Sequence, residues 1–252
     1  MTPKEINHLA SVLQGLPPEK QREVLMGVYA AGSNPGHVVV AAKPVRLAPI
    51  KKPADFAQLP AEQQNRLYAE GARKAVDEQF QATGIRSANQ QVPGLAGEVA
   101  RSNTATEMVG WLYTRTGAPN YSEIVLKTGA GNCDQMAKVA VDTINTSGGH
   151  ARIAQVKGHT FAIIGGPPGQ PRSKGFVGPE WDDAWVVDPW AGITCRAADY
   201  PGLFKARMQE WSQSGRRILI SDGATPPRSV WSDPMEPRWI AATVDGEAQV
   251  FQ

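Results

Sequence analysis

One cysteine in this chain has the surroundings of a nucleophile. Cys133 follows Gly131-Asn132 and opens an apolar stretch with helical spacing. Asn132 suits the N-cap and Gln135 the third helical position, so the pair predicts a capping box with Cys133 as the first helical residue. The unpaired N–H groups and the dipole at a helix N-terminus stabilise a thiolate, which is the reactive form of cysteine. We therefore predict that Cys133 is a nucleophile.

Two polar residues downstream complete the residue types of a catalytic triad. His159 stands at the head of an apolar run ending at Ile164, and Asp188 follows a second run over 184–187. A histidine beside the thiol forms a thiolate–imidazolium pair, and a carboxylate on the second ring nitrogen orients the imidazole. Each residue type alone is usually structural, but their combination with these elements favours catalysis. The predicted catalytic residues are Cys133, His159 and Asp188.

Other residues compete for the roles of base and orienter. His150 follows two glycines in a predicted turn, whereas His159 begins a predicted strand. Asp182 and Asp183 adjoin the polar end of a long loop, where carboxylates are usually exposed. These positions make His159 and Asp188 the better candidates.

The second cysteine, Cys195, is better explained as a free buried thiol than as a reactive one. With two cysteines in the chain, a disulfide framework is excluded. A zinc site built from Cys133, His150, His159 and Cys195 is conceivable, but no spacing typical of zinc ligands organises them. We expect no metal and no cofactor.

Thiol attack on an amide creates an oxyanion that needs hydrogen-bond donors. The backbone N–H of Cys133 is one candidate, and a donor of this kind is typically worth roughly 3 kcal/mol. Four upstream residues have side chains that would serve as the second donor, and no local motif chooses among them: Gln90, Gln91, Trp111 and Asn120.

Four short segments form a pattern along the middle of the chain. They are Gly131-Asn132-Cys133, Ser147-Gly148-Gly149, His159-Thr160-Phe161 and Val187-Asp188-Pro189. This order of a Gly-x-Cys helix, a Gly-rich turn, a strand bearing His and a strand ending in Asp-Pro resembles the core of the papain-like and transglutaminase-like cysteine enzymes. The resemblance covers about a quarter of the chain. In style it is nearest to Cys-His-Asp domains of bacterial toxins and injected effectors.

The resemblance implies a nucleophile helix packed on an antiparallel sheet and a thioester intermediate. It implies a protein-glutamine deamidase that acts as a toxin or effector on a protein from a target cell. Three alternatives stay open at this point: a cysteine protease or cell-wall peptidase, transglutaminase-type acyl transfer, and a non-catalytic binding module of the same fold. The triad alone does not separate them.

The elements that must position these residues predict an α+β fold. The nucleophile helix is expected to end at Gly148-Gly149, and an earlier helix over 60–83 is expected to bury Leu67, Val76 and Phe80. The segment 165–180, rich in Gly and Pro, is expected to be a lid or a long hairpin connection. The remaining expected helices cover 98–113 and 203–211, and the expected strands cover 151–157, 160–164, 184–187, 216–221 and 238–244.

The first part of the chain differs from the rest. Apolar residues at helical spacing predict two short amphipathic helices within 6–16 and 24–32, and five prolines break the stretch 33–60. We therefore predict two parts: a helical segment with a Pro-rich linker over 1–57, and a catalytic domain over 58–252. The first part would serve delivery, a secretion chaperone or another partner.

Composition narrows the partners and the compartment. The net charge of +2 over 252 residues favours no nucleic-acid partner. No apolar run is long enough to span a bilayer, and the first ten residues lack the apolar stretch of a signal peptide. The chain is expected to be made in a bacterial cytoplasm and, if it is an effector, to leave it through a specialised secretion system.

Overall fold

The structure is a computed structural model that describes residues 46–167, 172–221 and 228–251. The two amphipathic helices expected within the first 45 residues lie outside the described residues, and the division of the chain at residue 57 stays a prediction. Residues 46–57, which that division assigns to the linker, contact the body of the protein. The backbone N–H of Ile50 donates to Ser147 Oγ (2.8 Å), and Leu47, Ile50 and Phe56 pack against the main core.

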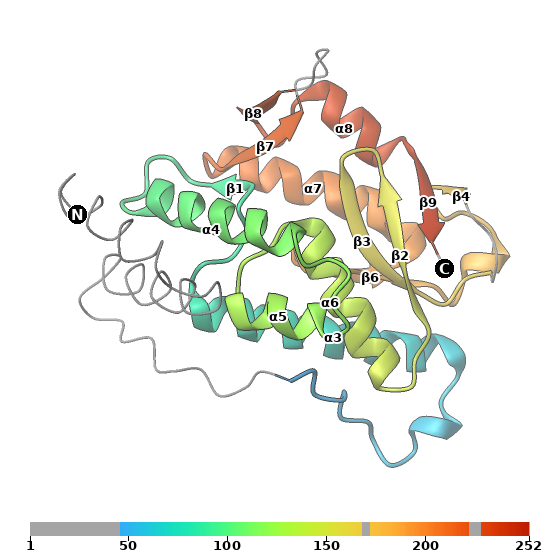
Figure 1. The fold of residues 1–252 in the computed structure, drawn as a ribbon. Coiled ribbons are helices and arrows are strands. Elements are labelled where there is room, and N and C mark those ends of the chain that lie inside the picture. Colours follow the sequence, from blue (N-terminus) through green and yellow to red (C-terminus); the bar gives the residue numbers. More distant parts are fainter. Residues whose placement is uncertain (1–45, 168–171, 222–227, 252) are drawn as a thin grey trace. The chain divides into compact units, whose positions relative to one another are not determined.

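The described residues have an α+β architecture (Figure 1). The helices are η1 (Phe56–Gln58), α3 (Ala61–Thr83), α4 (Glu98–Tyr113), α5 (Tyr121–Thr128), α6 (Cys133–Thr146), η2 (Pro179–Trp181), η3 (Ala197–Asp199), α7 (Tyr200–Gln213) and α8 (Pro237–Val244). The strands are β1 (Gln90–Gln91), β2 (Ala151–Val156), β3 (His159–Ile164), β4 (Arg172–Lys174), β5 (Trp185–Asp188), β6 (Ile193–Arg196), β7 (Arg217–Ser221), β8 (Ser229–Ser232) and β9 (Glu247–Phe251).

Two antiparallel sheets organise these strands. The larger sheet has the order β4-β9-β2-β3-β5-β6, and the smaller has the order β1-β7-β8. The helices α3, α5 and α6 pack against one another, and α6 also packs on β2, β3 and β5 (Figure 1). The helix α7 contacts β6 and α8. This arrangement confirms the expected α+β class with a helix packed on an antiparallel sheet.

The strand β3 lies inside the large sheet and is buried along its whole length. Its residues from Phe161 to Ile164 are all apolar, which suits a strand covered on both faces. His159, at the start of β3, is therefore held by a rigid element rather than by a loop.

The helix α6 begins as the sequence predicts. The Asn132 side chain accepts from the backbone at the third helical position, and the Asn132 N–H donates to Gln135 Oε1 (2.8 Å), which completes the capping box. Cys133 is the first helical residue. A Cβ at Gly131 would lie 2.9 Å from the Cβ of Gln135, so the turn before the cysteine packs too closely for a side chain there.

The helix α3 also follows its prediction, with one correction. It ends at Thr83, and Gly84 adopts a left-handed conformation (φ 71°) as its C-cap. Val76 and Phe80 are buried, but Leu67 is only half-buried. The buried face begins at Tyr68 and Ala69 instead, because α3 turns this side towards α6 and the sheet.

The expected strand over 238–244 is wrong, because these residues form α8. The Glu236 side chain accepts from the N–H of Trp239 (2.7 Å) and Pro237 occupies the first turn, which are both signals of a helix start. Trp239, Ile240 and Thr243 then form the buried face at helical spacing.

The segment 165–180 is more than a loop, since it contains β4 and the start of η2. The strand β4 pairs with β9 at the edge of the large sheet. Sequence patterns did not predict β1, β4, β6, β8, β9 or α5, most of which are short elements at sheet edges. Among the residues that the structure describes, no helix is long and apolar enough to cross a membrane.

Candidate active site

His159 and Asp188 form a buried pair. His159 Nε2 lies 2.8 Å from Asp188 Oδ2. The register of β3 and β5 explains this contact, because Ala162 pairs with Val187 and the next position along places Asp188 beside Phe161. His159 lies two residues from Phe161 on the same face, within diagonal reach across the strands.

Cys133 is the third residue of the site. Cys133 lies close enough to His159 to favour the charged form of its imidazole. Since Nε2 faces Asp188, the nitrogen left for the thiol is Nδ1. The structure thus brings all three predicted residues together: one from the start of a helix, one from the start of a strand and one from the end of the neighbouring strand.

The charge of His159 is set by opposing effects. Burial lowers the pKa of the imidazole, but the charge of Asp188, the hydrogen bond to Asp188 and the contact with Cys133 outweigh it and raise this pKa to about 10. The imidazole is therefore protonated at neutral pH. A positive ring beside the sulfur favours the thiolate, which is the form that attacks carbonyl carbons.

Two further donors hold the carboxylate of Asp188. The Tyr200 hydroxyl donates to Oδ2 (2.8 Å), and the backbone N–H of Ala191 donates to Oδ1 (3.0 Å). Burial, followed by the charge of Asp188, raises the pKa of Tyr200 well above its ordinary value, so Tyr200 stays a neutral donor. Tyr200 was not among the residues predicted from the sequence. No motif marks it, because its contact depends on how α7 packs against the sheet.

Trp190 covers His159 and links it to the segment before α4. The Trp190 and His159 ring centroids are 4.9 Å apart. Trp190 Nε1 donates to Asn89 Oδ1 (2.7 Å) and to Ser87 Oγ (3.1 Å). Trp190 is itself buried, so it packs the core of the site rather than forming an open wall for substrate.

The same segment also reaches the start of the nucleophile helix. The backbone N–H of Asn89 donates to Asn132 Oδ1 (3.2 Å). The Arg86 N–H donates to Gly129 O (2.9 Å), and the Gly131 N–H donates to Arg86 O (3.2 Å). Residues 86–89 therefore lie directly against the turn that precedes Cys133.

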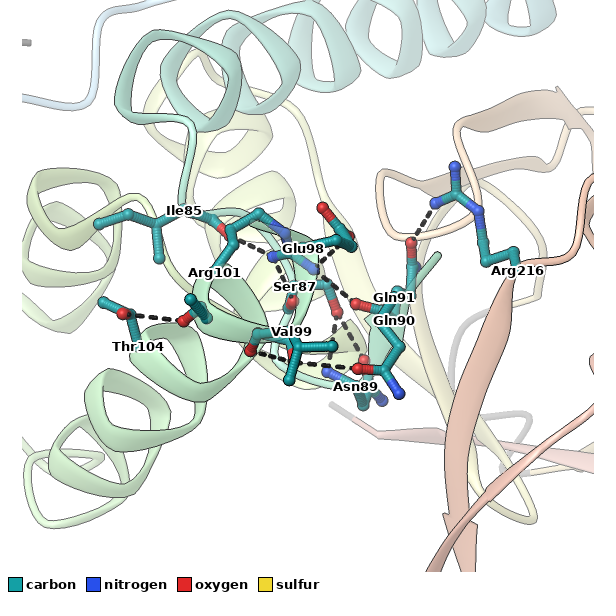
Figure 2. Close-up of polar contacts among 12 residues, drawn as sticks. Ile85, Ser87, Asn89, Gln90, Gln91, Glu98, Val99, Arg101, Thr104 and Arg216 are labelled. Carbon is teal, nitrogen blue, oxygen red and sulfur yellow. Dashed lines mark hydrogen bonds and ion pairs between the residues drawn. The ribbon is translucent and has the colours of Figure 1, made fainter. Parts of the chain in front are cut away.

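Arg101 holds this segment in place (Figure 2). Its Nη1 donates to the carbonyl oxygens of Ile85 and Ser87, and its Nη2 donates to Gln90 O (2.6 Å) and Glu98 Oε1 (2.8 Å). A planar guanidinium with several fixed donors suits the binding of several carbonyl oxygens at once. Arg101 is a positioning residue that sequence reasoning did not reveal.

The structure shows the contacts and positions of the four residues considered as second oxyanion donors. Gln90 uses both ends of its amide, because Nε2 donates to Trp190 O (3.0 Å) and Oε1 accepts from Arg216 (2.9 Å). Gln91 Oε1 accepts from Ser102 (3.3 Å). Trp111 lies near the end of α4 with the Arg115 guanidinium over its ring, and Asn120 is the N-cap of α5.

The rival residues lie in different environments. His150 is exposed in the turn before β2, and Asp182 is exposed after η2. Asp183 Oδ1 accepts from the Gly166 N–H (3.0 Å). Burial, Asp199 and Asp188 raise the pKa of the Cys195 thiol to about 12, so this thiol is protonated at neutral pH.

A search of the described ranges for three or more His, Cys, Asp or Glu residues placed to hold a metal ion found no such group. Comparisons with protein-family models, with curated proteins and with solved structures found no match for this chain. The site itself is what indicates a function: an α+β protein carries a buried Cys-His-Asp cluster at a helix N-terminus.

Proposed function

We propose that this protein is a cysteine amidohydrolase with a papain-like or transglutaminase-like core, and that it deamidates a glutamine side chain of a target protein. The observation that carries the proposal is the Cys133–His159–Asp188 cluster at the start of α6, in which Nε2 of His159 faces the carboxylate of Asp188 and Cys133 is close enough to favour the charged imidazole. A nucleophile, its base and an orienter in contact are the signature of thiol catalysis.

The burial of the cluster supports a glutamine side chain over a peptide bond. Cys133 is 9% exposed, His159 is 2% exposed and Asp188 is 0% exposed. A glutamine amide stands at the end of a slender chain, so it needs only a narrow opening to reach a buried thiol. A peptide bond carries chain on both sides and needs a groove that binds several residues by backbone pairing.

The steps of deamidation follow from the roles of Cys133 and His159. The Cys133 thiolate attacks the amide carbon and forms a tetrahedral oxyanion, and the His159 imidazolium gives its proton to the departing nitrogen. Ammonia leaves, and a thioester links the sulfur to the substrate. His159 then removes a proton from water, and the resulting hydroxide attacks the thioester. The carbon–sulfur bond breaks, the product leaves as a carboxylic acid that ionises in water, and the thiolate–imidazolium pair is restored.

Asn89 is a better second oxyanion donor than the four residues considered from the sequence. Its Oδ1 accepts from Trp190 Nε1 and from Ser87 Oγ. Because an indole nitrogen only donates, the atom facing Trp190 must be the oxygen, which leaves the two Nδ2 hydrogens pointing elsewhere. Within the described ranges, Asn89 Nδ2 forms no hydrogen bond. The Asn89 backbone N–H donates to the side chain of Asn132, the N-cap residue of the nucleophile helix.

Asn89→Ala is therefore expected to lower kcat by about 10²- to 10³-fold with little change in KM, as expected for loss of a donor that acts on the oxyanion. The matched control is Ser87→Ala, which removes hydrogen bonds to both Trp190 and Asn89 but no donor to the oxyanion. Steady-state kinetics of both variants decide the role. Equal losses in the two variants would show that Asn89 acts only through the hydrogen bonds that join Ser87, Asn89 and Trp190, and not as a donor to the oxyanion.

The toxin or effector role in this proposal rests on the resemblance of the segment 131–190 to such domains. In this setting the chain is made in a bacterial cytoplasm and delivered to a target cell by a specialised secretion system. The segment 1–57 then binds a secretion chaperone or another partner. The target is a protein, and the site needs no cofactor for the chemistry above.

Product analysis tests the function. A candidate target protein is incubated with the wild-type chain or with Cys133→Ala, and the products are measured by intact-mass and peptide-level mass spectrometry together with ammonia release. Deamidation leaves an intact target with glutamate in place of a glutamine. New termini that depend on Cys133 would establish a protease, and cross-linked or amine-modified glutamine would establish acyl transfer. Identical products from both proteins would contradict catalysis by the thiol.

A further inference from the structure

Arg216 carries a half-buried positive charge beside the site. Its Nη1 donates to Gln90 Oε1 (2.9 Å), and its guanidinium lies 4.6 Å from the centre of the Trp211 ring. Its Nε is buried and has no hydrogen-bond partner. Across residues 46–167, 172–221 and 228–251, no carboxylate forms an ion pair with Arg216. Burial lowers the pKa of this guanidinium.

The charged side chains around Arg216 do not neutralise its positive charge. Glu98 favours the charged form of Arg216, whereas Arg86, Arg101 and Arg207 oppose it. Glu98 is already paired with Arg101 (2.8 Å). Arg207 has its own partner in Glu210 (2.8 Å). The side chain of Arg86 forms no ion pair in the described part of the chain, so Arg86 and Arg216 leave an excess of positive charge here.

The contacts of Arg216 within the protein do not require a charge. A neutral amide at this position would still donate a hydrogen bond to Gln90, and an apolar side chain would pack on Trp211. Even a half-buried charge is costly when no opposite charge pairs with it, so a site that keeps one is expected to bind an anion. Guanidinium is the side chain that best matches a carboxylate, which it binds through two parallel hydrogen bonds.

Arg216 is connected to the catalytic cluster through two contacts. The Gln90 side chain that accepts from Arg216 donates to Trp190 O (3.0 Å), and Trp190 packs against His159. The Trp211 ring beneath Arg216 also contacts the Trp190 ring, with centroids 5.1 Å apart. Arg216 is therefore linked to His159 through Gln90 and Trp190, and also through Trp211 and Trp190.

We propose that Arg216, assisted by Arg86, is a specificity-determining residue that binds a carboxylate of the substrate close to the target glutamine. The inference rests on the proposed function and adds the chemical class of the substrate: a glutamine in an acidic segment. The carboxylate belongs either to an acidic side chain or to a free chain end, and the experiment separates these sources.

The test uses matched glutamine peptides with the full-length protein. One peptide has glutamate beside the target glutamine, one has neutral residues there, and each is made with a free and with an amidated C-terminus. We expect wild-type kcat/KM to favour the acidic peptide by about 10- to 100-fold, in line with one charge-assisted hydrogen bond. A preference that depends on the free C-terminus alone would identify the chain end as the ligand.

Variants of Arg216 then test the residue. Arg216→Gln is expected to bring the ratio of acidic to neutral kcat/KM close to one, and Arg216→Lys to restore part of it. Arg216→Glu is expected to favour a peptide with lysine beside the glutamine. The matched control is Arg207→Gln, because Arg207 is a neighbouring arginine that already has a carboxylate partner. This control should keep the wild-type ratio.

Peptide binding to the Cys133→Ala protein, measured by calorimetry, separates this inference from the proposed function. Acidic preference in binding without turnover by the wild type would support the role of Arg216 and reject deamidation of these peptides. Equal turnover and equal binding of acidic and neutral peptides would overturn the role of Arg216 while leaving the deamidase intact. A wild-type ratio in a folded Arg216→Gln protein would overturn it as well.

Discussion

Replacing Cys133 by alanine is expected to abolish amide hydrolysis, with a loss on the order of 10⁶-fold, while the protein stays folded. The reason is that the thioester cannot form without the sulfur, and any residual rate comes only from substrate binding and oxyanion donors. The side chain is small and stands at the first position of α6, so its removal leaves the capping box of Asn132 and Gln135 intact. Circular dichroism and thermal unfolding check the fold.

The matched control for this prediction is Cys195→Ala, which should retain most of the activity. Cys195 is also buried, but its thiol is protonated at neutral pH and faces no imidazole partner in the site described above. Labelling with iodoacetamide gives an independent measurement, in which Cys133 should react first despite its low exposure, because only a thiolate reacts readily. Faster labelling of Cys195 in the native protein would show that the nucleophile was assigned wrongly.

Loss of His159 is expected to be as damaging as loss of the thiol. Without the imidazole, only the helix N-terminus is left to stabilise the thiolate, and no group is left to protonate the departing nitrogen or activate water. Asp188→Asn should cost less, about 10²- to 10⁴-fold, because Asn still accepts a hydrogen bond and keeps part of the orientation of the ring. Added to Cys133→Ala, the same change should cost little more, since the residues act as a unit. Steady-state kinetics measure each loss.

His150→Ala is the control for this second prediction, and its effect should be mild because His150 is exposed in a turn. Full activity of His159→Ala would move the role of base to another residue. The burial of His159 makes its own variant prone to instability, so His159→Gln, which keeps more of the side-chain volume, is measured beside it. Near-wild-type activity in either variant would contradict the proposed mechanism.

The pH dependence of stability provides a separate test of the His159–Asp188 pair. The folded pKa of His159, about 10, lies above the ordinary value of 6.5 expected in the unfolded chain. The pair therefore contributes its full stability below about pH 6.5, and this contribution is lost as pH rises through about 10. The midpoint of thermal unfolding of the wild type should fall over this range more than that of Asp188→Asn. The same pH dependence of the unfolding midpoint in both proteins would show that His159 and Asp188 do not form a charged pair.

Several features of the fold were predictable from the sequence because they depend on neighbouring residues. The capping box and the placement of Cys133 follow from the identity and spacing of Asn132 and Gln135. The end of α3 follows from Gly84. The apolar runs that became β3 and β5 also placed His159 and Asp188 at strand ends, where functional side chains reach a common edge.

Short edge strands and α8 were not recognised, because their patterns are weak or ambiguous at this length. The apolar residues of the stretch 238–244 fit both the spacing of a strand and the spacing of a helix. The hydrogen bond from the Trp239 N–H to the Glu236 side chain caps a helix and favours that structure. The strands β4 and β9 pair across about 75 residues of intervening chain, so neither is apparent from its own sequence.

By itself, the sequence determined the identity of the nucleophile, base and orienter candidates, because each carries a local signal at the end of a helix or strand. Only the tertiary structure decided what supports them. The bonds from Trp190 to Asn89 and from Arg216 to Gln90 join residues 101 and 126 positions apart, and Tyr200 reaches Asp188 only through the docking of α7. Single polar residues have no periodicity, so such partners become visible only when packing brings distant segments together.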